Sequence, residues 1–177
     1  MLTLRDIPNL YRHEVRHSSE NGTPGDPLFG PYEAPKSQLL EDFEKEKRVA
    51  WSKTTRAVGW ERCWGVREGN EIKGHLLLKH FPRLPTSLHR ATLEMGIEKS
   101  HRHTGHGSRL IETAIEWALT ESELQWLDLR VFEENSAARK LYEKMGFVET
   151  GRVTDCFRVF GRSITDISMS REIHRRS

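Results

Sequence analysis

The sequence predicts an α/β or α+β fold built on a mixed sheet, and two observations carry this prediction. Between residues 91 and 146, segments with strand-like alternation of apolar and polar residues alternate with segments of helical spacing. On either side of this region, two strand-like segments are separated by a short turn that contains glycine. Alternating strands and helices of this kind pack as helices on a sheet.

The region before the first strands predicts two helices joined by a long loop. Asp6 has the position of an N-cap and Pro8 lies in the following turn, so a helix is expected to extend to about Glu20. Residues 19–35 contain three glycines and four prolines, which interrupt regular structure. A loop as long as this often serves a binding site. A second, charged amphipathic helix is expected over residues 37–53.

Strand patterns start at Trp64, and residues 64–80 predict a hairpin that turns at Gly69 and Asn70. The next run, residues 91–98, alternates regularly and predicts a strand. One of its faces carries Ala91, Leu93, Met95 and Ile97, and the other carries Thr92, Glu94, Gly96 and Glu98.

The remaining elements complete the alternation. Apolar residues recur at helical spacing over 105–121, and residues 125–132 predict a strand. A short helix over 135–145 is ended by Gly146, the residue type typical of that position. Two last strands, over 147–160 and 163–173, turn around Gly161. We therefore expect a single domain over residues 1–177, within the usual size of roughly 100–200 residues.

Composition and charge exclude several classes of protein. Hydrophobic residues make up 36% of the chain and charged residues 31%, as in globular proteins rather than disordered ones. No apolar stretch approaches the ~20 residues of a membrane helix, and the N-terminus lacks the apolar core of a signal peptide. Cys63 and Cys156 are expected to be reduced thiols of a cytoplasmic protein. The net charge of +2 is spread evenly, so neither nucleic acid nor a membrane is expected as a partner.

The strongest chemical signal is the junction between a strand and a helix at residues 97–108. Main-chain N–H groups at the start of a helix are unpaired and lie at the positive end of its dipole, so they favour an anion. Gly105 and Gly107 would let a ligand approach the backbone, and Arg102 adds a positive charge. A diphosphate would suit this turn; an ordinary strand–helix connection with two glycines is the alternative.

The turn matches neither common nucleotide-binding motif. A P-loop requires lysine and then serine or threonine after its last glycine, where this chain has Ser108 and Arg109. The dinucleotide-binding motif requires a third glycine at the position of Leu110.

Arg102-x-x-Gly105-x-Gly107 after a strand resembles the acyl-CoA-binding signature of the GNAT superfamily of N-acetyltransferases. A second block resembles the family's later motif: it starts at Asn135 and contains Ala138, Leu141, Tyr142, Gly146 and Phe147. The two blocks stand in the family's order with a strand between them, and the resemblance covers about residues 64–170. Lys99 stands where relatives commonly carry proline, a departure that loosens the match in the turn but removes no required group.

The resemblance implies a GNAT-type fold: a mixed, mostly antiparallel central sheet with helices on both faces and a splayed central strand pair. Residues 1–63 would form variable N-terminal helices and an acceptor loop, and residues 64–173 a cofactor-binding core. Acetyl-CoA would be the co-substrate, with its pantetheine arm beside the strand, where Gly96 leaves room, and its diphosphate on the turn. The implied cofactor-binding residues are Met95, Gly96, Ile97, Arg102, His103, Thr104, Gly105, His106, Gly107, Ser108, Asn135 and Tyr142.

The same resemblance implies direct acetyl transfer to a primary amine of a small molecule or peptide. Tyr142 would protonate the leaving sulfur, although its spacing also suits a residue that simply packs in the core. Glu94 is the candidate base, with an exposed or ion-paired glutamate as the alternative. Asn135 is expected to cap its helix and, as is common in relatives, to contact the cofactor arm or an ordered water.

Acceptor specificity is expected to come from the loop, the second helix and the final hairpin. Candidate residues are Trp51, Trp60 and Trp64 as apolar walls, although core packing is expected for at least one of them, and Asp26 or Glu33 as attractors of a cation. No metal is expected, because the spacing of His101, His103 and His106 is irregular. The alternative functions are acetylation of a protein N-terminus or lysine and a catalytically silent acyl-CoA-binding module. Family members are often dimers, so a second copy of the chain is a candidate partner.

Overall fold

The computed structural model describes residues 1–80, 84–121 and 123–173; the end of the expected domain, residues 174–177, lies outside this part. The sheet has six strands in the order β1-β2-β3-β4-β6-β5. Their bounds are β1 (Glu61–Glu68), β2 (Glu71–Lys79), β3 (Arg90–Ile97), β4 (Trp126–Phe132), β5 (Val148–Val159) and β6 (Arg162–Glu172). The mixed sheet predicted from the sequence is confirmed.

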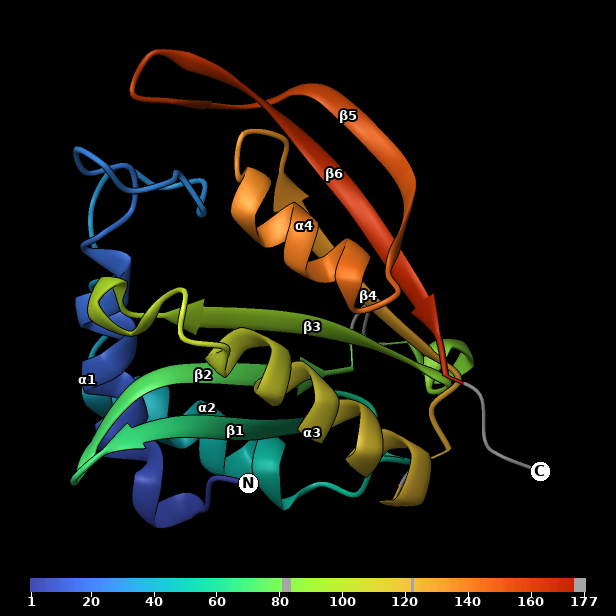
Figure 1. The fold of residues 1–177 in the computed structure, drawn as a ribbon. Helices are drawn as coiled ribbons and strands as arrows, with labels where there is room; N and C mark the ends of the chain where they lie inside the picture. Colours follow the sequence, from blue (N-terminus) through green and yellow to red (C-terminus); the bar gives the residue numbers. More distant parts are fainter. Residues whose placement is uncertain (81–83, 122, 174–177) are drawn as a thin grey trace.

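The central strands β3 and β4 separate along their length. They are parallel and pair only where they begin: Arg90, Ala91 and Thr92 lie opposite Trp126, Leu127 and Asp128. The other neighbouring strands are antiparallel. Beyond Thr92 the sheet divides into two halves, β1–β3 and β4–β6–β5, which diverge as Figure 1 shows. The splayed pair implied by the family resemblance is therefore present.

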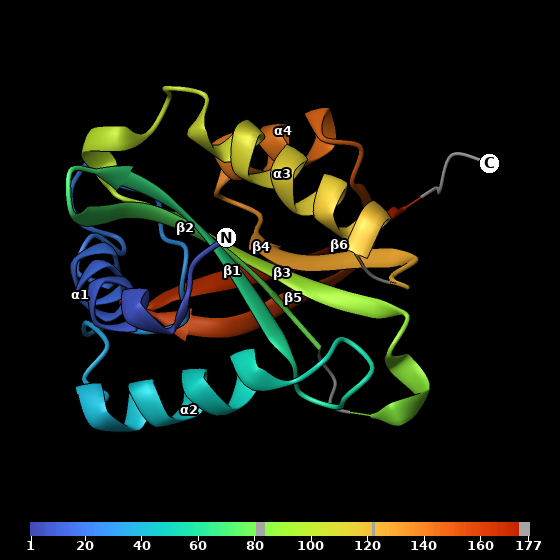
Figure 2. The same ribbon diagram turned by 90° about the horizontal axis from the view of Figure 1, so that it is seen from below.

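Four α-helices cover the two faces of the sheet. They are α1 (Ile7–Ser18), α2 (Leu40–Ser52), α3 (His106–Glu121) and α4 (Ser136–Lys144). Figure 2 shows α1 and α2 on one face and α3 and α4 on the other. Ala91 and Leu93 of β3 belong to the larger apolar core, together with Ile111 and Ala114 of α3. The alternation predicted for β3 is present, and its apolar face packs against α3.

Trp60 and Trp64 pack in the core rather than against an acceptor pocket. Both are buried in the larger core, with ring centroids 6.0 Å and 5.3 Å from that of Trp117 on α3. Both side chains lie on the side of this segment that packs against α3. Trp51 packs on a smaller apolar cluster beneath α1 and α2.

Asp6 forms its hydrogen bonds in a short turn before α1, one turn earlier than expected. A short 3-10 turn, Leu4–Asp6, precedes α1. The Asp6 carboxylate accepts hydrogen bonds from the main-chain N–H of Thr3 (2.8 Å) and from its hydroxyl (3.1 Å). The helix then ends at Ser18, so Glu20 belongs to the loop that follows.

Both cysteines of the chain, Cys63 and Cys156, are free, as predicted. Among the described helices, none is long and apolar enough to cross a membrane.

Candidate active site

Strand β3 has one edge open to the gap between the two halves of the sheet. On one side, residues 92–97 pair with β2. On the other side, the ladder to β4 stops at Thr92. The main chain of Met95, Gly96 and Ile97 therefore faces the gap without a partner strand. Such an edge can bind an extended ligand as though it were an added strand.

The turn after β3 presents a row of unpaired main-chain amides. His103 and Gly105 both have positive φ, 62° and 83°, and α3 begins directly after them. The first hydrogen bond of the helix runs from the N–H of Arg109 to the carbonyl of Gly105, at 3.2 Å. Within the described part of the chain, the N–H groups of residues 103–108 have no hydrogen-bond partner. Together with the positive end of the helix dipole, they form a site suited to an anion.

The two glycines of the turn have different roles. At Gly105 an added Cβ would meet nothing within 4 Å, and glycine suits the position because φ is positive. At Gly107 a Cβ would lie 2.8 Å from Cδ2 of Leu141 and near Met95 and Ile97. Gly107 thus lets α3 pack closely on α4 and β3.

The side chain of Arg102 is fixed by a hydrogen bond and two ion pairs within the protein. Its Nε donates to the carbonyl of Ile97 at 2.9 Å, and its guanidinium pairs with Asp26 at 2.6 Å and with Glu20. Asp26 also pairs with Lys99 at 2.9 Å. The sequence assigned Arg102 to a diphosphate and Asp26 to a cationic acceptor, but here the two charges compensate each other.

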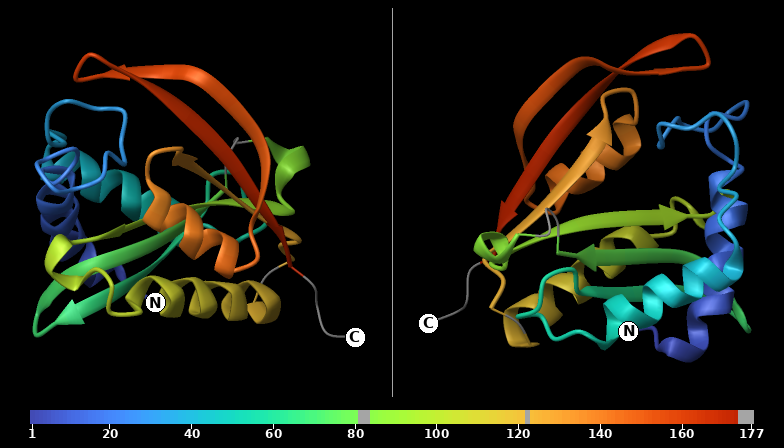
Figure 3. Two further views of the ribbon diagram at one scale, coloured as in Figure 1. Left: turned by 45° about the horizontal axis from the view of Figure 1, so that its top comes forward. Right: turned by 180° about the vertical axis from the view of Figure 1, so that it is seen from behind.

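The loop between α1 and α2 crosses the open end of the gap, as Figures 1 and 3 show. On one side, Glu20 and Asp26 hold it to Arg102, just after β3. On the other side, Glu33 accepts a hydrogen bond from the N–H of Phe160 at 2.5 Å. Leu28 joins a small apolar cluster with residues of β4, β5 and β6, namely Phe132, Val159 and Ile164. The loop therefore links the two halves of the sheet where β3 and β4 diverge.

Tyr142 of α4 is buried in the larger core, and its ring lies edge-on to that of Phe147 at a centroid distance of 5.9 Å. Burial raises the pKa of Tyr142 to about 12, so its hydroxyl stays protonated at neutral pH. The hydroxyl has no hydrogen-bond partner among the described residues. The ring packs in the core, and the hydroxyl keeps a proton that it could donate.

Asn135 caps α4, as predicted: its Oδ1 accepts a hydrogen bond from the N–H of Ala138 at 3.3 Å. Glu94 lies on the face of β3 opposite Leu93. Its side chain is 49% exposed and pairs with Lys79 of β2. Because β2 lies on the side of β3 away from the gap, this ion pair draws the Glu94 carboxylate away from the open edge.

A cluster of histidines lies on the face of β3 that α1 covers. His13 and His17 come from α1 and His75 comes from β2. A Cβ on Gly96 would lie 2.8 Å from ring atoms of His17 and 3.1 Å from Cε1 of His75. The space that the sequence suggested for a cofactor arm at Gly96 is therefore filled by two imidazole rings on this face. The edge of the strand stays open.

This cluster was not among the predictions from the sequence, because its members meet only where α1 crosses β2 and β3. Two signals were present in the sequence. His13 and His17 are four residues apart and so share one side of a helix. His75 is the one histidine in a strand whose following residues are leucines, Leu76 to Leu78.

The histidines of the turn form no metal site. His101 and His106 stack with their ring centroids 6.3 Å apart, and Nε2 of His101 lies 3.6 Å from the carboxylate of Glu68. Among the described residues, no group of three or more histidine, cysteine, aspartate and glutamate side chains is arranged to hold a metal ion.

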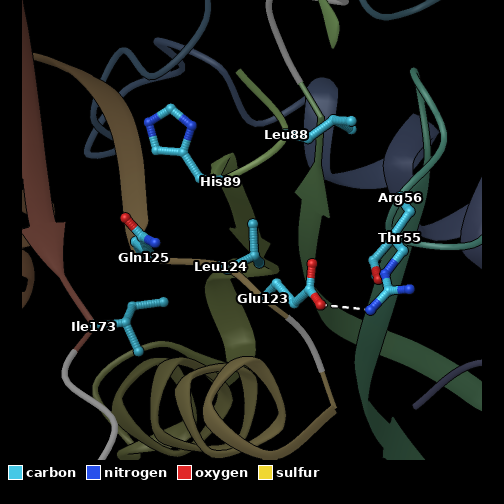
Figure 4. Close-up of a pocket in the computed structure, with 8 residues that line it drawn as sticks. All are labelled: Thr55, Arg56, Leu88, His89, Glu123, Leu124, Gln125 and Ile173. Carbon is cyan, nitrogen blue, oxygen red and sulfur yellow. Dashed lines mark hydrogen bonds and ion pairs between the residues drawn. The ribbon is translucent and has the colours of Figure 1, made fainter. Parts of the chain in front are cut away.

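A surface hollow of about 620 Å³ lies at the other end of β3 and β4, where the strands begin (Figure 4). His89 and Gln125 line it, and the ion pair between Arg56 and Glu123, 2.5 Å, lies at one side. The two strands are paired at this end. The hollow therefore lacks the open strand edge and the amide-lined turn.

The splayed central strand pair and the amide-lined turn are the features that the resemblance to acetyltransferases implied. The model of the acetyltransferase (GNAT) family matches residues 30–147, and the chain belongs to this family. A stretch of 76 residues is 36% identical to a spermidine N(1)-acetyltransferase of Vibrio cholerae. That match covers 42% of this chain and 44% of the relative, so it spans less than half of either protein.

Solved structures show the same fold. A GNAT-family acetyltransferase from Streptococcus pneumoniae has a TM-score of 0.81 at 24% identity, with 98% of this chain and 96% of that chain covered. A putative acetyltransferase from Salmonella typhimurium, solved with its cofactor acetyl-CoA, has a TM-score of 0.77 at 11% identity and coverages of 99% and 93%. A variant of spermidine N-acetyltransferase from Vibrio cholerae has a TM-score of 0.69 at 20% identity and coverages of 97% and 92%. At such identities the likeness establishes the fold alone.

Proposed function

We propose that this protein is an acetyl-CoA-dependent N-acetyltransferase that acts on a primary amine of a small molecule or peptide, with both substrates bound together. One observation carries the proposal: the open edge of β3 leads directly into a turn whose amides have no partner. An extended chain that ends in a diphosphate fits both features. The strand edge offers unpaired main-chain N–H and C=O groups to the chain, and the start of the helix favours the anion.

The residues present fit acetyl-CoA. The main chain of Met95, Gly96 and Ile97 would hold the pantetheine arm, and the amides of residues 103–108 would hold the diphosphate. Asn135 would add a contact from the other side of the gap. When bound, acetyl-CoA supplies an acetyl group activated as a thioester. Arg102 would contribute through the loop that it anchors, since its charge is already paired.

Two protons must move in this reaction. The acceptor arrives as an ammonium with a pKa near ~10 and must lose a proton, and the leaving sulfur must gain one. Tyr142, whose pKa burial raises to about 12, would donate to the sulfur. A main-chain N–H on the open edge of β3 would stabilise the negative charge that develops on the carbonyl oxygen.

The acceptor would enter on the α1 side of β3, beneath the loop of residues 19–35. This loop is fixed to both halves of the sheet, which narrows the entrance and favours a small amine over the surface of a folded protein. Polyamines come first in an acceptor panel, because the curated relative is named for spermidine. Residues 1–63 would thus supply the acceptor side, and residues 64–173 the cofactor side, of a single domain.

Two measurements test the proposal. Thermal unfolding is followed with and without acetyl-CoA, which at a hundredfold excess over its Kd should add about 2.7 kcal/mol of stability. Release of the CoA thiol is then assayed with polyamines, amino acids, aminoglycosides and peptides, and we expect release with at least one small amine. Stabilisation without release would favour a silent acyl-CoA-binding module, and release with peptides alone would favour a protein acetyltransferase. An absence of stabilisation would contradict the proposal.

A further inference from the structure

Arg130 lies on β4 just beyond the point where the two halves of the sheet separate. The last pair between β3 and β4 joins Thr92 to Asp128, and Arg130 follows two residues later. Its neighbours Leu129 and Val131 pack in the larger core. Because side chains alternate along a strand, Arg130 points to the opposite face, the one on which the acceptor is proposed to enter. Its side chain is 56% exposed there.

A buried carboxylate holds the inner edge of this guanidinium. Nε of Arg130 donates to Oδ2 of Asp166 on β6 at 2.5 Å, and the Asp166 side chain is only 3% exposed. Asp166 lies opposite Phe132 in the ladder between β4 and β6, so it is on the same face as Arg130. The guanidinium carbon also lies over the ring of Phe157, 5.8 Å from its centroid. The protein therefore fixes one edge and one face of the guanidinium.

The outer edge of the same guanidinium remains open. Nη2 lies 3.6 Å from Sγ of Cys156, which is a weak acceptor. Nη1 has no hydrogen-bond partner among the described residues. Arg102 differs, because all three of its nitrogens donate within the protein and its side chain is 17% exposed. An open pair of guanidinium nitrogens matches the two oxygens of a carboxylate.

The carboxylates near the gap are already engaged within the protein. Glu94 pairs with Lys79, and Asp128 accepts two hydrogen bonds from Arg90, at 2.5 Å and 2.8 Å. The acids that anchor the loop are engaged as well. A polyamine would have to displace an internal partner from one of these carboxylates. A carboxylate can bind the outer edge of Arg130 without displacing any cation.

We propose that Arg130 binds the carboxylate of the acceptor, so that the acceptor is an amino acid or another small amine that carries a carboxylate. Asp166 is then a positioning residue that orients the guanidinium. The inference rests on the proposed function and names its substrate class. Arg130 lies as far beyond the last strand pair as Glu94 does on β3, which is where the open edge of β3 begins. A carboxylate bound there leaves the amine on its neighbouring carbon free to face the gap.

The ion pair with Asp166 suits this role better than a role in stability alone. Removing a carboxylate from water offsets most of the attraction that it gains, so a buried ion pair adds little to stability. It does fix the direction of the guanidinium, and it raises the pKa of Arg130, so the charge persists at any working pH. The competing assignment is that the pair only ties β4 to β6. In that case Arg130 would affect stability but not the choice of acceptor.

The experiment compares CoA release by purified wild type with free amino acids, with the carboxamide of each and with spermidine. A carboxamide keeps the amine and the side chain of the amino acid but lacks the carboxylate. We expect kcat/KM for at least one amino acid to exceed that for its carboxamide and for spermidine by about 10–10³-fold. A dipeptide with that amino acid at its N-terminus should also be a poor acceptor, because its carboxylate is displaced from the amine. This last comparison separates free amino acids from peptides.

Variants assign the preference to Arg130. In Arg130→Gln, kcat/KM for the amino acid should fall by about 10–10³-fold while that for its carboxamide changes little. Arg130→Lys keeps the charge but not the paired N–H groups, so it should recover part of the loss. Asp166→Asn should raise KM for the amino acid more than it lowers kcat. Stabilisation by acetyl-CoA should be unchanged in all three variants.

Arg158→Gln is the matched control. Arg158 belongs to the same hairpin, is 69% exposed and pairs with Asp155. Its ladder partner Ser163 lies on the face of β6 opposite to that of Asp166. The control variant loses the same charge and should keep the wild-type preference.

Two results would overturn the inference and leave the proposed acetyltransferase in place. One is that wild type uses spermidine or the carboxamides as well as it uses the amino acids. The other is that Arg130→Gln lowers the rate with every acceptor equally, as the loss of a purely structural ion pair would. If wild type binds acetyl-CoA but transfers nothing to any amine, the proposed function fails first and this inference with it.

Discussion

The substitution Gly96→Ala tests whether the rings of His17 and His75 pack directly on β3 at Gly96. The new Cβ would lie 2.8 Å from Cε1 and Nδ1 of His17 and 3.1 Å from Cε1 of His75. Neither ring can turn aside easily, since His75 is hydrogen-bonded to His13 and His17 is stacked on Phe29. One side chain or the strand must therefore shift.

The magnitude follows from two opposing effects. Inserting a methyl group into a packed site costs about 1–3 kcal/mol, and replacing glycine returns about 0.4–1 kcal/mol by restricting the unfolded chain. A net loss of about 0.5–2 kcal/mol should lower the Tm by about 1–8 °C in a chain of this size.

The assay is thermal and urea unfolding of Gly96→Ala beside the matched variant Gly151→Ala. Gly151 lies in β5, where an added Cβ would meet nothing within 4 Å and φ is not positive. We expect Gly151→Ala to be neutral or slightly stabilising. If Gly96→Ala were as stable as Gly151→Ala, the two imidazole rings would not occupy the space over β3, and the reasoning would be refuted.

Three further predictions concern the acid, the histidines and the loop. Tyr142→Phe should lower turnover by about 10²–10⁴-fold with unchanged stabilisation by acetyl-CoA; an unchanged turnover would exclude Tyr142 from the mechanism. The free energy of unfolding should fall as the pH drops from about 6.5 to about 3, because burial lowers the folded-state pKa of His75 and the unfolded chain then binds more protons. In His75→Asn, the free energy of unfolding measured by urea titration should change less steeply with pH. An unchanged pH dependence would contradict the burial of a neutral His75 in the folded protein. Asp26→Asn should speed proteolytic cleavage within residues 19–35, whereas Asp42→Asn on the exposed side of α2 should not; equal cleavage of both would show that Asp26 does not anchor the loop.

The elements of the fold could be predicted because their signals are local. The alternation of Ala91, Leu93 and Met95 with Thr92 and Glu94 predicts β3 and its buried face without reference to any other part of the chain. The cap of Asn135 on α4 is equally local, since it depends on residues within one turn. The divergence of β3 and β4 has no local signal, and it was expected only through the family motifs.

The site was less predictable because its contacts join distant residues. Arg102 forms ion pairs with Glu20 and Asp26, which lie more than 70 residues earlier in the sequence. No local spacing pattern predicts pairs of this kind. Gly107 has the position of a ligand-binding glycine, yet its packing against Leu141 depends on how two helices approach each other. The hydrogen bonds that join His13 to Glu98 and to His75 likewise form only when three elements come together.

The central claim is that the open edge of β3 and the turn after it bind acetyl-CoA. Amide hydrogen exchange, measured with and without CoA, tests it most directly. The account predicts slower exchange over residues 93–97 and 103–108 and no change at Thr55, Arg56 and Gln125, which line the hollow at the other end of the strands. Protection at the hollow with unchanged exchange over residues 93–108 would contradict the claim.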